Sequence, residues 1–144
     1  MDLYDIFAGA ESFHVRKLLE HARGLTDAQL DKPLNNPVHA FPWDSPAQSL
    51  RDLLRRLVVT KEVWVAALTG ASLPDLDAEP PEQRTPDALC EPPETFSFAG
   101  MLAHVINLNT YQRLPALETL RRLGVKVGGF GCPTEYEASL APAR

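Results

Sequence analysis

The residues that decide the fold are 45–70, "SPAQSLRDLLRRLVVTKEVWVAALTG". Ser45 is a favoured N-cap residue, Pro46 suits the first position of a helix, and Gly70 suits its end. We therefore predict a helix over these residues, because their apolar side chains fall on one broad face that would lie in the core. The residues on that face are Leu50, Leu53, Leu54, Leu57, Val58, Trp64, Val65 and Leu68.

An earlier helix is predicted over residues 3–23, where apolar residues again recur at helical spacing. Gly24 ends this pattern. Thr26 then suits the N-cap of a short turn that Pro33 closes.

A last helix is predicted to begin at Ser97 and to run to about Leu123, with Gly124 as its C-cap. Pro115 lies inside it, where proline removes one backbone hydrogen bond. We therefore expect this long helix to bend near its middle.

The segments between the predicted helices are rich in proline. Residues 33–45 also carry asparagines and should form a loop, and residues 71–96 are Pro- and acid-rich and should form a surface connection or a poorly formed helix. Residues 125–144 read as a Gly-rich turn followed by an irregular tail. No stretch alternates with a period of two, so residues 1–144 are predicted to form one all-α domain.

Composition excludes several classes of function. The net charge of −5 argues against nucleic-acid binding, which needs a basic face to neutralise phosphates. No apolar run approaches the roughly 20 residues that cross a bilayer, and residues 1–10 lack the features of a signal peptide. We expect a cytoplasmic protein in which Cys90 and Cys132 are reduced.

The predicted last helix has apolar residues over about half of its circumference, which exceeds the stripe of about 100° that one surface contact needs. One flank would face the bundle interior and the other would need a further helix or a second subunit. We predict a homodimer, because a short chain has few helices to offer. The candidate interface residues are Leu102, Ile106, Leu117 and Leu120, with Asn109 and Arg113 as polar groups that would fix its register.

Motifs of metal or nucleophilic chemistry are missing from the sequence. A metal site on a helix commonly uses two ligands four positions apart, but no two of His14, His21, His39 and His104 have this spacing. There is no GxSxG motif, and "GGFG" lacks the Lys-Ser/Thr of a phosphate-binding loop. The residues by themselves predict neither a catalytic site nor a bound metal.

Three segments together resemble the DinB-like proteins, a damage-inducible family of small helical bundles. "SLRDLLRRLVVTKEVWVAALTG" (49–70) resembles the second helix of that family, and "LAHVINLNTYQRLPALETLRRLGV" (102–125) resembles its last long helix. "ESFHVRKLLEHARGLTDAQLDKP" (11–33) is similar to its first helix and the turn after it. The resemblance implies a four-helix bundle, usually dimeric, in which residues 71–96 are a degenerate third helix.

The resemblance also implies a metal site in many relatives, where three histidines hold a divalent ion and some members are thiol transferases. The corresponding positions in this chain are Arg56, Leu108 and Gln112. Arginine stays protonated and leucine has no donor atom, so neither can serve as a ligand. A shift of register that makes His104 a ligand again places Leu108 at its partner position.

We therefore favour a metal-free, DinB-like, dimeric binding or stress-associated protein that uses no cofactor. Its candidate pocket is lined by Arg56, Thr60, Trp64, His104 and Gln112, and the Arg56 guanidinium could face an anionic small molecule. One alternative is a metal-dependent thiol transferase or hydrolase that holds its metal through His39, His104 and a carboxylate. Another alternative is a helical protein-interaction module without a pocket.

Overall fold

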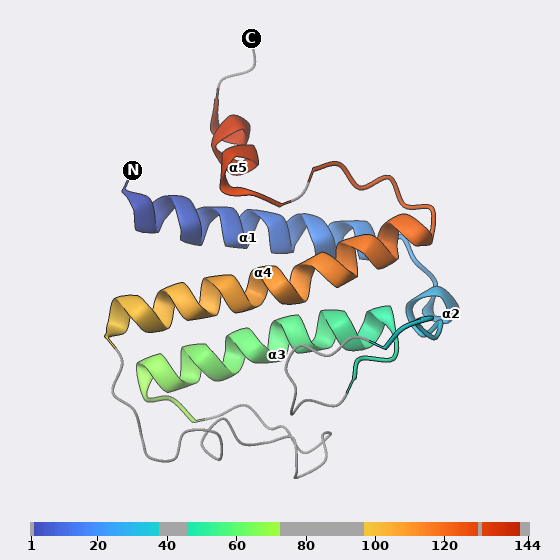
Figure 1. Cartoon of the computed structure of the whole chain (residues 1–144), viewed down its shortest axis with the longest axis horizontal. Coiled ribbons are helices and arrows are strands. Elements are labelled where there is room, and N and C mark those ends of the chain that lie inside the picture. Colours follow the sequence, from blue (N-terminus) through green and yellow to red (C-terminus); the bar gives the residue numbers. More distant parts are fainter. Residues whose placement is uncertain (1, 38–45, 73–96, 130, 142–144) are drawn as a thin grey trace.

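The computed structural model describes residues 2–37, 46–72, 97–129 and 131–141. This part of the chain forms helices and no strands, as predicted for an all-α protein (Figure 1). The helices are α1 (Leu3–Ala22), α2 (Asp27–Leu30), α3 (Leu50–Thr69), α4 (Phe98–Arg122) and α5 (Pro133–Leu140).

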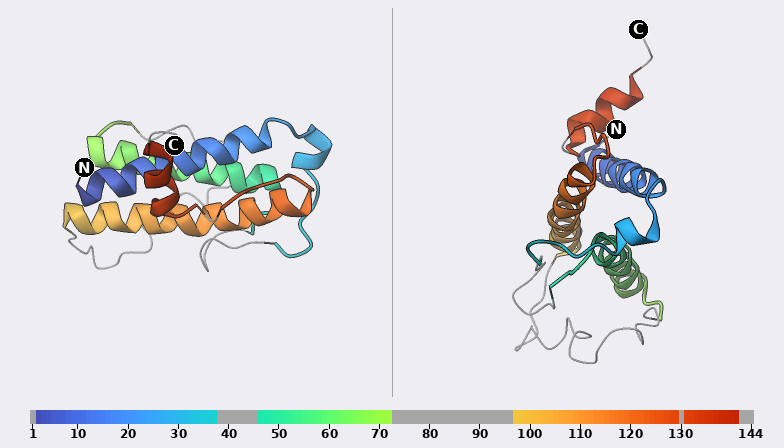
Figure 2. Two further views of the ribbon diagram at one scale, coloured as in Figure 1. Left: turned by 90° about the horizontal axis from the view of Figure 1, so that it is seen from above. Right: turned by 90° about the vertical axis from the view of Figure 1, so that its right-hand side faces the viewer.

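The central long helix, α4, lies between α1 and α3 and contacts both of them (Figure 1). A view along the helices shows α1, α4 and α3 at three corners, with α2 at the end of the bundle (Figure 2, right). The short helix α5 packs on α1, on the side of α1 that faces away from α3 (Figure 1). The chain directions of α3 and α4 are opposite, as their colours run in opposite senses.

The apolar core lies toward the end of the bundle where α3 begins and α4 ends. Leu18, Leu50, Leu57 and Leu120 have essentially no exposed surface. Each buried leucine side chain of this kind stabilises the fold by about 1.5–3 kcal/mol relative to an exposed one. The buried core cluster consists of Leu18, Ala47, Leu50, Leu53, Leu57, Ala116, Leu117 and Leu120.

The helix beginnings follow from local hydrogen bonds between side chains and backbone. Thr26 caps α2 as predicted, and its side chain accepts from the Gln29 N–H while Gln29 reaches back to Thr26. Ser97 caps α4, also as predicted. A cap of this type contributes about 1 kcal/mol to helix stability.

The predicted beginning of the helix over residues 45–70 was wrong. Helix α3 begins at Leu50, and Ser49 caps it in a reciprocal pair with Asp52. Two orphan N–H groups are satisfied there, which favours Ser49 over the sequence signal of Ser45 and Pro46. Gly70 ends the helix in the left-handed conformation, with φ of 67°, as predicted.

The prediction of an irregular tail was also wrong. Residues 133–140 form α5, which Cys132 precedes as N-cap and Pro133 begins at a position that suits proline. The side chain of His14 on α1 donates from Nε2 to the Cys132 carbonyl oxygen at 2.8 Å. Tyr136 covers Gly9 so closely that a β-carbon at Gly9 would overlap the phenol ring. The tail is therefore a packed element of the fold.

Two sequence predictions fall largely outside the described residues, namely the loop at 33–45, of which 38–45 are not described, and the connection at 71–96, of which 73–96 are not described. Residues 33–37 follow the prediction of a loop and contain no helix or strand. None of the helices in the described part of the chain is both long and apolar enough to cross a bilayer.

Candidate functional site

The predicted pocket residues of α3 and α4 lie in direct contact with each other. The Gln112 amide nitrogen donates to Thr60 Oγ1 at 3.1 Å. Trp64 lies one turn after Thr60 on α3, and His104 lies about two turns before Gln112 on α4. The rings of Trp64 and His104 lie 5.5 Å apart between centroids, tilted by 59°. We call Thr60, Trp64, His104 and Gln112 the α3–α4 seam. The structure thus brings four of the five predicted pocket residues together as two contacting pairs.

The fifth predicted residue, Arg56, lies on α3 one turn before Thr60 and is half-buried. Because α3 and α4 run in opposite directions and Thr60 faces Gln112, Arg56 lies level with residues after Gln112 on α4. Leu108 lies one turn before Gln112 on α4 and is buried, with 6% of its surface exposed.

Two residues of α4, Gln112 in the seam and Asn109 nearby, carry buried polar atoms. Asn109 and Gln112 have 2% and 7% of their surface exposed, and neither Asn109 Oδ1 nor Gln112 Oε1 has a hydrogen-bond partner within the described residues. A buried acceptor without a donor costs about 1–3 kcal/mol. These two oxygens can therefore accept hydrogen bonds that no group in the described residues donates.

No group of three histidine, cysteine, aspartate or glutamate side chains in residues 2–37, 46–72, 97–129 and 131–141 is arranged to hold a metal ion. His39, a member of the alternative ligand set, lies outside these ranges. His104 is exposed and its ring contacts Trp64.

Four of the six candidate interface residues are buried within the single chain. Leu117 and Leu120 belong to the core cluster, and Asn109 and Arg113 have 2% and 3% of their surface exposed. These four side chains are therefore not available to a second subunit. The reason is that α4 is central, so that its broad apolar surface is shared between α1 and α3. Leu102 and Ile106 are half-buried near the beginning of α4.

Arg113 takes part in a buried ionic cluster that was not predicted from the sequence. Its guanidinium donates to the Glu11 carboxylate on α1 and, at 2.9 Å, to the Gly131 carbonyl oxygen. The other carboxylate oxygen of Glu11 accepts from Lys61 Nζ at 2.5 Å. We call Glu11, Lys61 and Arg113 the ionic cluster. A signal was present, because Glu11 lies seven positions before Leu18 and so on the buried face of α1.

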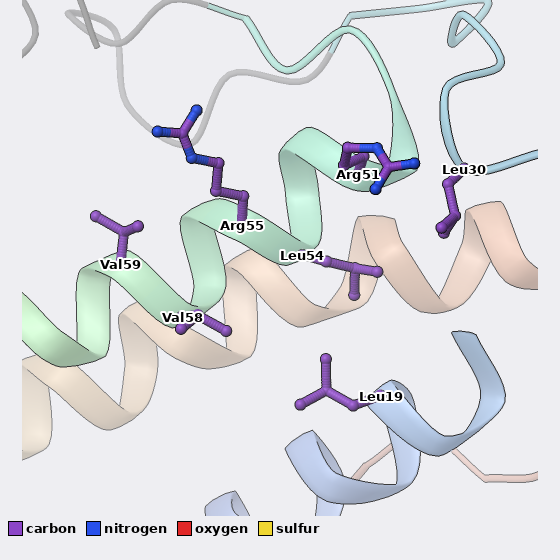
Figure 3. A pocket seen from close by; sticks show the side chains of 7 residues that line it. All are labelled: Leu19, Leu30, Arg51, Leu54, Arg55, Val58 and Val59. Atoms are coloured by element: carbon purple, nitrogen blue, oxygen red, sulfur yellow. The ribbon is translucent and has the colours of Figure 1, made fainter. Parts of the chain in front are cut away.

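Residues of α1, α2 and α3 line an open groove of about 360 Å³ on another part of the bundle (Figure 3). In the close view Leu54 and Val58 extend from α3, Leu19 extends from α1 toward them, and Arg55 extends from another edge of α3. We call this the α1–α3 groove. Its lining residues are Leu19, Leu30, Arg51, Leu54, Arg55, Val58 and Val59.

Ion pairs fix one end of this groove. Arg51 donates to Asp31 at 2.5 Å and to Asp27 at 2.7 Å, which ties α3 to α2 and the residue after it. The hydrogen bond from Arg51 holds the pKa of Asp31 below its usual value of 3.8. Hydrogen bonds to Asp31 and Asp27 raise the pKa of Arg51, which stays charged. Arg55 is exposed and forms no ion pair within the described residues.

The thiol of Cys132 is free and partly exposed at the beginning of α5. Its sulfur lies 3.0 Å from Thr134 Oγ1. The nearby His14 is turned to the Cys132 backbone oxygen, and its Nδ1 lies 3.9 Å from Glu135 Oε2. These side chains hold the tail on α1 and do not form a Cys–His pair for nucleophilic catalysis.

No protein-family model, no curated protein and no solved structure matches this chain.

Proposed function

We propose that this chain is a metal-free binding protein of the DinB-like, four-helix type, with a small-molecule ligand and without the metal chemistry of that family. The proposal starts from the sequence resemblance of residues 11–33, 49–70 and 102–125 to the helices of those proteins. A stress-associated role, a cytoplasmic location and a homodimer belong to the same proposal. The stress-associated role rests on that resemblance and the location on the sequence composition. The homodimer rests on the resemblance and on the broad apolar surface of the last helix.

The observation that supports this proposal most is the seam between α3 and α4. The position of a family ligand on α4 is occupied by Gln112, whose amide nitrogen is used in a hydrogen bond to Thr60. Trp64 and His104 are in ring contact one turn further along α3 and two turns back along α4. Side chains that already bond or pack against each other are poorly suited to bind a divalent ion. A catalytic metal ion needs about three protein ligands and an open coordination position.

The experiment that tests this proposal is elemental analysis of the protein, purified without a metal-affinity step and without chelators. We expect far less than one equivalent of zinc, nickel, manganese or iron per chain. Titration calorimetry with Zn²⁺ and Ni²⁺ should show no binding that His104→Ala removes.

A stoichiometric metal that is lost in the His104→Ala variant would contradict the proposal and favour the metal-dependent thiol transferase instead. Lys126→Ala is a suitable matched control, because Lys126 is exposed and lies outside the seam. Its metal content should equal that of the wild type in either case.

A further inference from the structure

We propose that the α1–α3 groove binds a small amphiphile with an aliphatic chain and an anionic head group, such as a medium-chain carboxylate. This inference rests on the proposed binding function and gives it a place and a ligand class. The place differs from the α3–α4 seam, where the sequence had placed the pocket.

The apolar lining of the groove indicates that the ligand has an aliphatic chain. Leu19 of α1, Leu30 of α2 and Leu54 of α3 come from three helices, and two valines of α3 complete the wall. Val58 keeps 38% of its surface exposed, so a ligand that covers it removes apolar surface from water. Among the described residues, no amide, hydroxyl or carboxylate side chain lines the groove. An unbranched aliphatic chain fits such walls because it needs no hydrogen bond.

The positive charge of the groove indicates that the head group of the ligand is anionic. The two ionisable residues in its lining are both arginines, Arg51 and Arg55 (Figure 3). Arg51 is held by Asp27 and Asp31, whereas Arg55 forms no ion pair within the described residues. A ligand carboxylate beside Arg55 could therefore accept hydrogen bonds from the Arg55 guanidinium. This local charge is opposite to the net charge of −5 of the whole chain.

The size of the groove favours a small molecule over a protein. Its volume of about 360 Å³ lies within the range of roughly 300–1,000 Å³ that small-molecule sites occupy. Its wall on α3 runs from Arg51 to Val59, which corresponds to about 12 Å of helix. A stable protein interface buries about 1,200–2,000 Å² in total. The α1–α3 groove is too short to supply such an area.

Titration calorimetry with octanoate, decanoate and dodecanoate tests the proposal on the full chain. We expect the affinity to rise by roughly tenfold for each two added methylene groups. Decanoate should bind more tightly than decanol, and decyltrimethylammonium should bind least, because the groove edge is cationic. Folded protein that binds none of the carboxylates, or binds all three head groups equally, would overturn the proposal.

Matched variants locate the site. Val58→Asp should weaken decanoate binding by about tenfold or more, because it places a charge against the aliphatic chain. Val65→Asp, at a valine of α3 that is 59% exposed and outside the groove, should stay within about twofold of the wild type. Equal losses in both variants would overturn the assignment.

A second pair of variants tests the head group. Arg55→Gln should weaken decanoate by about threefold and leave decanol unchanged, since only the carboxylate needs the cation. Arg122→Gln, an exposed arginine of α4 paired with Glu118, should change neither. A loss of decanol binding in Arg55→Gln that equals the loss of decanoate binding would contradict the assigned role of Arg55.

Two further measurements distinguish ligand binding in the groove from self-association and from metal binding. Sedimentation of the wild type and of Val58→Asp should give the same oligomeric state, and a change would identify the groove as a contact between copies. The metal content of each preparation separates the two proposals. A metal-loaded chain that binds decanoate contradicts only the proposed metal-free function, and a metal-free chain that does not bind decanoate contradicts only the groove.

Discussion

Glu11 of α1 and Arg113 of α4 form an ion pair in the interior of the bundle, although 102 positions separate them in the sequence. Arg113 has 3% of its surface exposed and Glu11 has 10%. Lys61 of α3 completes the cluster, with 29% of its surface exposed. The cluster therefore joins the three long helices through one carboxylate, and the guanidinium also holds the tail at Gly131.

Removal of the Glu11 charge should destabilise the fold strongly. In Glu11→Gln, Arg113 stays buried without its counter-ion, which costs about 3–5 kcal/mol for a buried pair. Urea unfolding followed by circular dichroism measures this loss. Lys61→Met should cost much less, because Lys61 is more exposed and its removal leaves the Glu11–Arg113 pair intact.

Replacement of the whole pair distinguishes an ionic requirement from a packing requirement. Glu11→Leu combined with Arg113→Leu removes both charges, so no isolated ion remains in the interior. We expect the double variant to be more stable than Glu11→Gln. A double variant that is as unstable as the single one would show that packing around Arg113, and not its charge, decides the stability.

The sequence predicted the long helices well because their signals are local. Regular apolar spacing and the end glycine gave α3 its extent apart from its first residues. The beginning differed because Ser45 and Ser49 carry the same capping signal in the sequence, and the helix begins at the reciprocal pair of Ser49 and Asp52. Helix α5 was missed because it carries little apolar periodicity, and its position depends on Tyr136 packing over Gly9.

The candidate sites were harder to predict, because they depend on which helices pack against each other. No local sequence pattern shows this. The wheel of the last helix correctly showed two apolar flanks, but it did not show that α4 lies between α1 and α3. Asn109 and Arg113 were accordingly assigned to a second subunit, although the partners of Arg113 lie within the same chain. The contact of Thr60 with Gln112 could be predicted from the sequence, because the resemblance implied that the helices now seen as α3 and α4 lie side by side.

The link between α2 and α3 should depend on pH at the acidic end. The pKa of Asp31 is lowered in the fold, so its contribution to stability is present above the ordinary value of 3.8 and is lost as the pH falls through the folded value. The stability difference between the wild type and Asp31→Asn should therefore shrink below pH 3.8. Urea unfolding across this range measures it.

Salt supplies the control for this prediction. The charges are exposed, so added sodium chloride should reduce the difference between the two proteins at neutral pH. Asp5→Asn, at a carboxylate of the α1 capping box, should leave the link between α2 and α3 unchanged. A difference that persists unchanged at acidic pH would mean that the Asp31 charge is not its source.

The proposed homodimer can be tested on the part of α4 that is not buried in the chain. Leu102 and Ile106 are the two candidate interface residues that keep partial exposure. We expect sedimentation at micromolar concentration to show a dimer, and Leu102→Glu to shift it toward monomer, because a charge at an apolar contact is costly. A monomeric wild type would contradict the dimer.

The contact between Gly9 and Tyr136 should hold α5 on the bundle, and a single methyl group tests it. Gly9→Ala places a β-carbon where the phenol ring lies, so α5 should detach and Pro133–Leu140 should lose protection in hydrogen exchange. Alanine also favours the α1 helix by about 0.5–1 kcal/mol over glycine, so global stability should fall less than α5 protection. In a Tyr136→Ala background the same change should only stabilise, because no ring opposes the methyl group. Unchanged protection of α5 in the single Gly9→Ala variant would mean that α5 is held by other contacts, chiefly the hydrogen bond from His14 to the Cys132 carbonyl oxygen.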